Sequence, residues 1–226
     1  MSPLSSVSRS VTRFAALALL ALPAVASDDV LSHLLQSVEL RYNGARTLQV
    51  LFTETYAGAG RGRQTEAGVL YLRKPGRMRW EYRTPAGKLF LSDGKQVYFF
   101  NPATNRAEKT KLHETEDMRA PLAFLLGKLD FSKDFSKFDL KNQGSDAVIT
   151  AIPKSDKLPY NRVEFTVNPL NGYAIKRLVV NGQDGAVLTF DFANEVLNPN
   201  LSEKVFHFQL PPGAQWVDLT QGESAQ

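Results

Sequence analysis

The chain contains no cysteine among its 226 residues. Disulfides, thiolate nucleophiles and cysteine-ligated metal sites are therefore excluded. A lipid-modified cysteine is excluded for the same reason, so the chain carries no acyl anchor of its own. The three histidines, His33, His113 and His207, lie far apart and lack metal-ligand spacing. No G-x-S-x-G motif is present either. We expect no catalytic site, no metal and no cofactor.

Long hydrophobic runs are also missing, apart from one short run near the start. Residues 14–22 are apolar, but a membrane span needs about 20 residues. Arg9 and Arg13 precede this run, and Ala24-Val25-Ala26 follows it as a small-x-small cleavage site. This order is typical of a secretory signal peptide at residues 1–26. Residues 27–226 are then one exported domain, long enough to bury a sizeable core.

The chain also has no large excess of positive or negative charge. The formal net charge is only +4, it is dispersed along the chain, and Arg9 and Arg13 belong to the leader. This is too weak for a nucleic-acid footprint, so no nucleic-acid partner is expected.

One amphipathic helix is predicted at the start of the mature chain. Ser27 and Asp28 are good N-caps, and Asn43-Gly44 is a normal helix stop. Between them the apolar residues follow helical spacing and form one stripe, which includes Leu34, Leu35 and Val38.

Strands dominate after this helix. From Arg77 to Arg83 the charged residues alternate strictly with Met78, Trp80 and Tyr82. A period of two indicates a strand with one wet face and one apolar face. The large side chains of the apolar face favour a hydrophobic, concave binding surface. We expect Met78, Trp80 and Tyr82 to line it, with the aromatic residues from Tyr98 to Phe100 beside them.

Turn signals divide the remainder into about eleven short strands. Asn181-Gly182 and Asp184-Gly185 between alternating runs are strong hairpin signals. Residues 205–210 are expected to form the last strand. Sequential antiparallel strands in this number form a sandwich or curl into a barrel.

A second apolar helix is predicted within residues 121–127, which begin with Pro and end with Gly. Residues 129–138 are predicted to extend it as another short helix. The segment is hydrophobic almost all round, so it must lie against an apolar surface. Its residues that should contact the concave surface are Leu122, Phe124, Leu125 and Leu126.

Several short motifs occur in a fixed order along the mature chain. They are LFTE at residues 51–54, KPGRMRW at 74–80, LSDGK at 91–95, YFFNP at 98–102, PLAFLL at 121–126, and FHF at 206–208 followed by Pro-Pro-Gly. Their order and spacing resemble those of the periplasmic outer-membrane lipoprotein carrier family, LolA, and the resemblance covers essentially the whole mature chain.

The resemblance implies an α+β fold that is mainly β, with an incomplete, strongly curved antiparallel barrel and short α-helices as a lid. It implies a periplasmic shuttle whose cavity binds the acyl chains of lipoprotein cargo. The cargo would come from an inner-membrane lipoprotein-releasing ABC transporter and pass to an outer-membrane lipoprotein receptor. Tyr98 and Phe100 would belong to the acyl-binding cavity with the residues named above, and the carrier would act as a monomer.

One position departs from the family pattern. In the family an arginine directly before the proline ties the lid to the barrel through backbone carbonyls. Here that position is Lys74, and Arg73 precedes it. Lysine can donate to carbonyls but lacks the planar fork of arginine. Arg73 points to the opposite face if the strand is regular. Lys74 or Arg73 is therefore the predicted lid latch.

Two other functions remain as alternatives at this stage. One is a periplasmic lipid-sensing or regulatory domain of the same fold, which a second domain would favour. The other is a hydrolase acting on lipid or glycan, which would need a catalytic constellation that the residues do not supply.

Overall fold

The computed structural model describes residues 26–58, 61–111 and 129–217. Its main element is one twelve-stranded sheet with the order β12-β6-β5-β4-β3-β2-β1-β11-β10-β9-β8-β7. All neighbours pair antiparallel except β12 and β6. The strands are β1 (Thr47–Gly58), β2 (Arg61–Arg73), β3 (Arg77–Thr84), β4 (Ala86–Asp93), β5 (Gln96–Asn101), β6 (Arg106–Lys111), β7 (Phe135–Gln143), β8 (Asp146–Pro153), β9 (Tyr160–Asn168), β10 (Ala174–Gly182), β11 (Val187–Leu197) and β12 (Gln215–Trp216).

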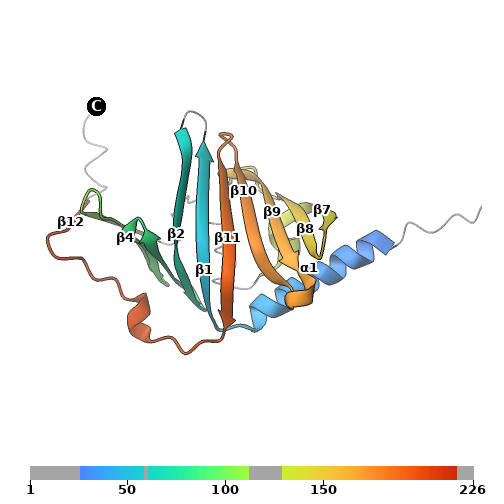
Figure 1. Ribbon diagram of the computed structural model, residues 1–226, viewed down its shortest axis with the longest axis horizontal. Coiled ribbons are helices and arrows are strands. Elements are labelled where there is room, and N and C mark those ends of the chain that lie inside the picture. Colours follow the sequence, from blue (N-terminus) through green and yellow to red (C-terminus); the bar gives the residue numbers. More distant parts are fainter. Residues whose placement is uncertain (1–25, 59–60, 112–128, 218–226) are drawn as a thin grey trace, which may run out of the picture.

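The sheet consists of two meanders that meet at one strand pair. Strands β1 to β6 run consecutively in one direction from the centre, and β11 back to β7 run in the other. The β1–β11 pair joins the two halves. The sheet curves strongly but does not close, since β12 and β7 remain its two edges (Figure 1). The predicted incomplete antiparallel barrel is confirmed, with one strand more than expected.

The predicted last strand at residues 205–210 is wrong. The chain there forms a short 3-10 helix, η4 (Glu203–Phe206), followed by irregular backbone, and the last strand is the two-residue β12. Ser202 caps η4 by accepting a hydrogen bond from the backbone N–H of Lys204. The alternating pattern at residues 205–210 reflects an extended segment that lies on the sheet without joining its ladder.

Two α-helices are described. Helix α1 (Ala26–Gly44) contains the predicted amphipathic helix. Helix α2 (Phe131–Asp134) is a single turn, so the helix predicted over residues 129–138 is wrong over most of its length. Asp130 caps this turn, and from Phe135 the chain pairs with β8 as an edge strand. The predicted apolar helix at residues 121–127 lies outside the described residues.

The concave side of the sheet carries the main hydrophobic cluster, to which both halves contribute. Trp80 lies at its centre, with its ring centroid 4.7 Å from that of Phe52 on β1 and 5.3 Å from that of Phe190 on β11. Helix α1 contributes to the same cluster. Its buried members include Leu48, Val50, Phe52, Leu70, Leu72, Met78, Trp80, Tyr82, Phe90, Val97, Ile149, Val163, Phe165, Leu178, Val180, Leu188 and Phe190.

The outer side of the β2–β6 half is covered by the last described segment, residues 198–217, which we call the C-terminal arm. In Figure 1 the arm leaves the lower end of β11, passes through η4 and reaches β12 at the edge of the sheet. Arg73 fastens it near its start by donating to Glu203 and to the Leu201 carbonyl. Phe208 stacks on Tyr98 near its end, with ring centroids 4.8 Å apart.

Gly68 permits close packing at a register shift between β2 and β3. A Cβ at this position would overlap the Glu81 carbonyl oxygen and would lie 2.9 Å from the Phe52 ring. The glycine therefore lets the backbone of β3 approach β2 where the sheet bends.

We expect Gly68→Ala to lower the free energy of unfolding by about 1–3 kcal/mol, because the new methyl group forces backbone shifts. Gly44→Ala is the matched control, since a Cβ there meets no atom within 4 Å. Urea denaturation followed by circular dichroism measures both. Equal stabilities for the two variants would contradict this account of the bend.

Candidate functional site

The concave face of β3 has the composition that the alternating pattern predicts. Met78, Trp80 and Tyr82 are buried there, and Trp80 has no exposed surface. Arg77 and Arg79 lie on the other face. The Trp80 indole donates to the Met78 sulfur at 3.0 Å, so its one polar group is satisfied inside the apolar cluster.

Two of the predicted aromatic residues lie on the wrong side of the sheet. Trp80 of β3 is paired with Phe90 of β4, and Phe90 is paired in turn with Phe99 of β5. Phe99 and Val97 therefore share the concave face with Trp80. Tyr98 and Phe100 point outward, where Tyr98 stacks on the arm and Phe100 lines a cavity beside it. The prediction erred because the run 97–100 is apolar on both faces and its parity does not show in the sequence.

Helix α1 covers part of the concave face. Leu34 and Val38 are buried in the concave cluster, and Leu35 packs against it half-buried. In Figure 1 the helix runs from the lower end of β1 towards the β8–β9 side of the sheet. The structure thus places Leu34, Leu35 and Val38 against the predicted surface, while Leu122, Phe124, Leu125 and Leu126 lie outside the described residues.

A second group of side chains, three phenylalanines of α2 and β7, also covers the concave face, and the sequence did not predict this arrangement. Phe131 of α2 and Phe135 of β7 are buried against Phe165 of β9, in near-perpendicular ring contacts at 5.3 and 5.9 Å between centroids. Phe138 joins this cluster. The spacing of the three phenylalanines in the sequence FSKDFSKF was the available signal, but it was assigned to a helix.

Lys74 contacts the end of α1. Its Nζ donates to the Tyr42 carbonyl at 2.6 Å, and its backbone N–H donates to the Arg46 carbonyl at 2.9 Å. Desolvation by burial lowers the pKa of the ammonium group. Arg73 instead reaches the C-terminal arm on the outer face. Of the two candidate latch residues, Lys74 is the one that contacts α1.

A polar network that the sequence did not reveal fixes the same helix end from the other side. Tyr42 Oη donates to Glu195 Oε2 at 2.8 Å and accepts from the Ile175 backbone N–H at 2.9 Å. Arg41 donates to Glu195 Oε1 through Nη2 at 2.5 Å and to the Gly172 carbonyl at 3.1 Å. These bonds hold the C-terminal end of α1 against β10 and β11.

The electrostatics of this network follow from burial. Tyr42 is only 3% exposed, and desolvation together with the Glu195 charge raises the pKa of its phenol strongly. Burial alone would lower the pKa of Arg41, but its hydrogen bond and ion pair with Glu195 outweigh that effect and raise it. The phenol therefore stays protonated and the guanidinium charged.

Three further hydrogen bonds tie α1 to α2 and to the segment that leads into it. Asn43 Nδ2 donates to the Leu129 carbonyl at 2.8 Å, and the Leu129 N–H donates back to Asn43 Oδ1 at 2.7 Å. The Phe131 N–H donates to Glu39 Oε1 at 2.7 Å. Helix α1 and the phenylalanine cover are thus fastened to each other as well as to the sheet.

A polar cluster lies further along the concave face, away from this helix end. Tyr82 Oη donates to Glu54 Oε2 at 2.8 Å, and Glu54 is only 7% exposed. Lys88 pairs with Glu66, and its Nζ lies 4.4 Å from the centroid of the Tyr82 ring. The apolar surface therefore ends in a charged, hydrogen-bonded border at β1–β4.

The space beneath the end of α1 is filled. Two spaces that border Tyr42 hold about 10 Å³ each, one towards Lys74 and one towards Phe192. Each has room for about one water molecule. An acyl chain could reach this part of the concave face only if α1 moved.

Within the described residues, no group of three or more His, Asp or Glu side chains is placed to hold a metal ion. His33 lies edge-on to the Tyr173 ring. His113 lies outside the described residues. In the same part of the chain, no helix has the length and apolar character needed to cross a membrane.

Comparison with known proteins gives one family and relatives that share its description. The family described as "Outer membrane lipoprotein carrier protein LolA" matches residues 43–209. The outer-membrane lipoprotein carrier protein of Sodalis glossinidius is 29% identical over 205 residues, covering 90% of this chain and 94% of that protein. The protein of the same description from Bordetella avium is 28% identical over 211 residues, covering 92% and 98%.

A solved structure shares the fold. An uncharacterized conserved protein from Thermus thermophilus superposes with a TM-score of 0.52 at 13% sequence identity. The match covers 83% of this chain and 98% of that one.

We expect Tyr42→Phe to lower the free energy of unfolding by about 1–3 kcal/mol, because it leaves a buried backbone N–H and a carboxylate oxygen without their partner. Tyr71→Phe is the control, since the Tyr71 hydroxyl makes no hydrogen bond within the described residues. Urea denaturation compares the two variants. A Tyr42→Phe protein as stable as the control would show that the network does not fasten α1.

Proposed function

Because the chain belongs to the family of outer-membrane lipoprotein carrier proteins, LolA, we propose that it is a periplasmic carrier that holds lipoprotein acyl chains on its concave face. The observation that carries the proposal is the continuous apolar cluster on that face, covered by the amphipathic helix α1. The leader at residues 1–26 would direct export and be removed, leaving residues 27–226 as the carrier domain.

The chemistry of the face suits hydrocarbon. Trp80, Phe52 and Phe190 meet where the two meanders join, and aliphatic side chains surround them. Such a surface attracts acyl chains without directional bonds, which matches cargo whose common part is its lipid. The function proposed is therefore binding and transfer, not a chemical reaction.

The cover solves an energetic problem. Acyl burial contributes about 0.8 kcal/mol per CH₂, so several long chains would exceed the practical ceiling of about 20 kcal/mol for non-covalent binding. A carrier must also release its cargo. Displacing Leu34 and Val38 of α1 from the face costs apolar contacts, and this offsets much of the gain from the acyl chains.

We propose that Lys74 acts as the latch of this cover. It is a single donor to the last turn of α1, whereas the Tyr42–Glu195 network holds the same turn from β10 and β11. Opening would break the Lys74 bond and swing the N-terminal part of α1 away. Leu122, Phe124, Leu125 and Leu126 are proposed to belong to the same cover.

The proposed route has two partners. Cargo would be accepted from an inner-membrane lipoprotein-releasing ABC transporter and delivered to an outer-membrane lipoprotein receptor. The carrier would travel between them as a monomer. The lack of any cysteine supports the carrier role over the receptor role, because a receptor of this family is itself a lipoprotein.

The two tryptophans provide a direct test of where acyl chains bind. Trp80 lies on the concave face, and Trp216 lies on the arm and is 47% exposed. We expect a triacylated lipopeptide with brominated acyl chains to quench Trp80 emission saturably in the Trp216→Phe variant. Emission from Trp216 in the Trp80→Phe variant should stay unchanged. Quenching of Trp216 alone would place the acyl chains away from the concave face and would contradict the proposal.

The latch is tested by Lys74→Leu, with Lys74→Arg as the variant that keeps a charged donor. A hydrogen bond from a charged group contributes about 1.5–3 kcal/mol, so its loss should favour the open form about tenfold or more. We expect Lys74→Leu to bind lipopeptide normally but to transfer it to the receptor about tenfold more slowly. Lys74→Arg should restore transfer. Normal transfer by Lys74→Leu would leave control of the cover to apolar contacts alone.

A further inference from the structure

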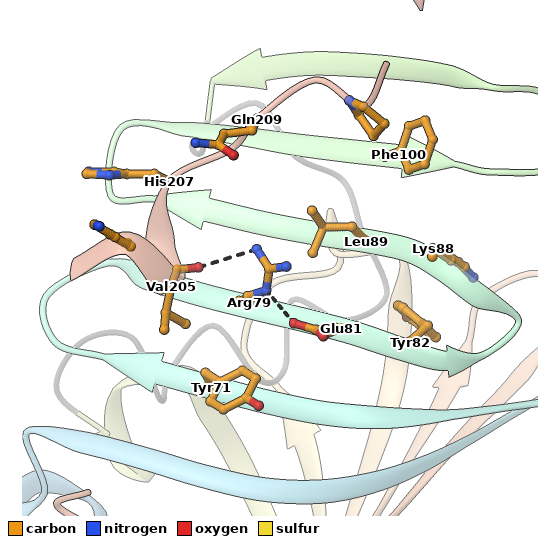
Figure 2. Close-up of a pocket in the computed structure, with 13 residues that line it drawn as sticks. Tyr71, Arg79, Glu81, Tyr82, Lys88, Leu89, Phe100, Val205, His207 and Gln209 are labelled. Carbon is orange, nitrogen blue, oxygen red and sulfur yellow. Dashed lines mark hydrogen bonds and ion pairs between the residues drawn. The ribbon is translucent and has the colours of Figure 1, made fainter. Parts of the chain in front are cut away.

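A cavity of about 870 Å³ lies on the outer face of the sheet, opposite the concave cluster. Its floor takes one side chain from each of four strands: Tyr71 of β2, Arg79 of β3, Leu89 of β4 and Phe100 of β5. The C-terminal arm forms its wall (Figure 2). The volume lies within the range of about 300–1,000 Å³ that ligand sites occupy.

The arm is fixed beside this cavity and does not fill it. Its side chains alternate, so that Val205, His207 and Gln209 line the cavity. Between them, Phe206 is buried next to the Arg73 guanidinium and Phe208 stacks on Tyr98. Because the two phenylalanines anchor the arm from within the same stretch, the wall is formed before any ligand binds.

Arg79 gives the cavity its charge. Figure 2 shows its guanidinium between the arm and the floor, with Nε donating to Glu81 at 2.8 Å and Nη1 at a long 3.4 Å from the Val205 carbonyl. Its Nη2 makes no hydrogen bond to any described residue. This nitrogen, with its two N–H donors, is therefore available to a ligand in the cavity.

The lining has an excess of positive charge. Lys204 adds a second cation, and Glu81 is the one carboxylate among the described lining residues. Lys88 also borders the cavity, but its ammonium pairs with Glu66 and lies over the Tyr82 ring. Glu203 is engaged by Arg73 and Arg77. Glu81 is bound to Nε of Arg79, so an anion would bind the remaining Nη2 of Arg79 and would also be attracted by Lys204.

Apart from His207 and Gln209, most of the remaining lining is apolar. Tyr71 and Leu89 are half-buried, while Phe100, Val205 and Pro211 continue the apolar surface past the guanidinium. An inorganic anion would leave this surface in water, and a neutral hydrocarbon would leave the charge of Arg79 unused. A ligand with both properties satisfies both parts of the cavity.

We propose that the outer cavity binds a single-chain amphiphile with an anionic headgroup. Its carboxylate or phosphate binds Nη2 of Arg79 with Lys204 nearby, and its hydrocarbon chain lies on Tyr71, Leu89 and Phe100. This site is separate from the concave face. The proposal does not rest on the carrier function. The floor of the cavity faces away from the concave cluster, and of its described lining residues only Tyr82 and Lys88 border both surfaces.

A reporter in the arm tests the site. Gln209 lines the cavity and is exposed, so Gln209→Cys labelled with bimane reports binding in a chain without other cysteines. We expect saturable fluorescence changes with laurate and with dodecyl phosphate, and the tighter of the two identifies the headgroup. Dodecanol, acetate and inorganic phosphate should bind at least about tenfold more weakly. Equal binding of dodecanol would overturn the proposal.

Two variants and one competitor locate the ligand. Arg79→Gln should weaken laurate or dodecyl phosphate about tenfold, and Lys204→Gln less. Arg83→Gln, on the same strand but outside the cavity, should have no effect. Saturating triacylated lipopeptide should not displace the ligand from the reporter. Unchanged affinity in Arg79→Gln with a native circular dichroism spectrum, or full displacement by lipopeptide, would contradict the assignment.

Discussion

The burial of one continuous apolar surface on the concave side of an open sheet is the constraint on which the rest of the structure depends. A closed barrel or a sandwich would bury such a surface within itself. Here the sheet stays open, so other segments must cover it. Helix α1 and the phenylalanines around α2 do so within the described residues. The cover is therefore as much a part of the core as the strands, and the proposed binding function depends on its being a separate element.

Polar bonds decide where that cover is held and where it is free. The last turn of α1 is fixed by the Tyr42–Arg41–Glu195 network, and the single bond from Lys74 to the same turn is the one that the proposed opening breaks. The N-terminal part of the helix relies on apolar contacts such as those of Leu34. Apolar contacts can be exchanged for acyl chains at little net cost, whereas directional bonds cannot. This division favours a helix that swings about its C-terminal end.

The sequence predicted the features that arise from local pattern. The alternation from Arg77 to Arg83 placed Trp80 on the concave face, and helical spacing placed Leu34 and Val38 against it. Prediction from the sequence failed where the hydrophobic pattern was ambiguous, and where two interacting residues are far apart along the chain. The run containing Tyr98 is apolar on both faces, so its parity was assigned wrongly. Glu195 is about 150 residues from Tyr42, and no local signal joins them.

The central claim is that α1 leaves the concave face when acyl chains bind. With no native cysteine, spin labels can be placed at Ser32→Cys on α1 and Lys95→Cys in the β4–β5 turn, both exposed. Pulsed electron resonance then measures the distance between them with and without triacylated lipopeptide. The account predicts one narrow distribution that lengthens or broadens by several ångströms on binding. An unchanged distribution at saturating lipopeptide would contradict it.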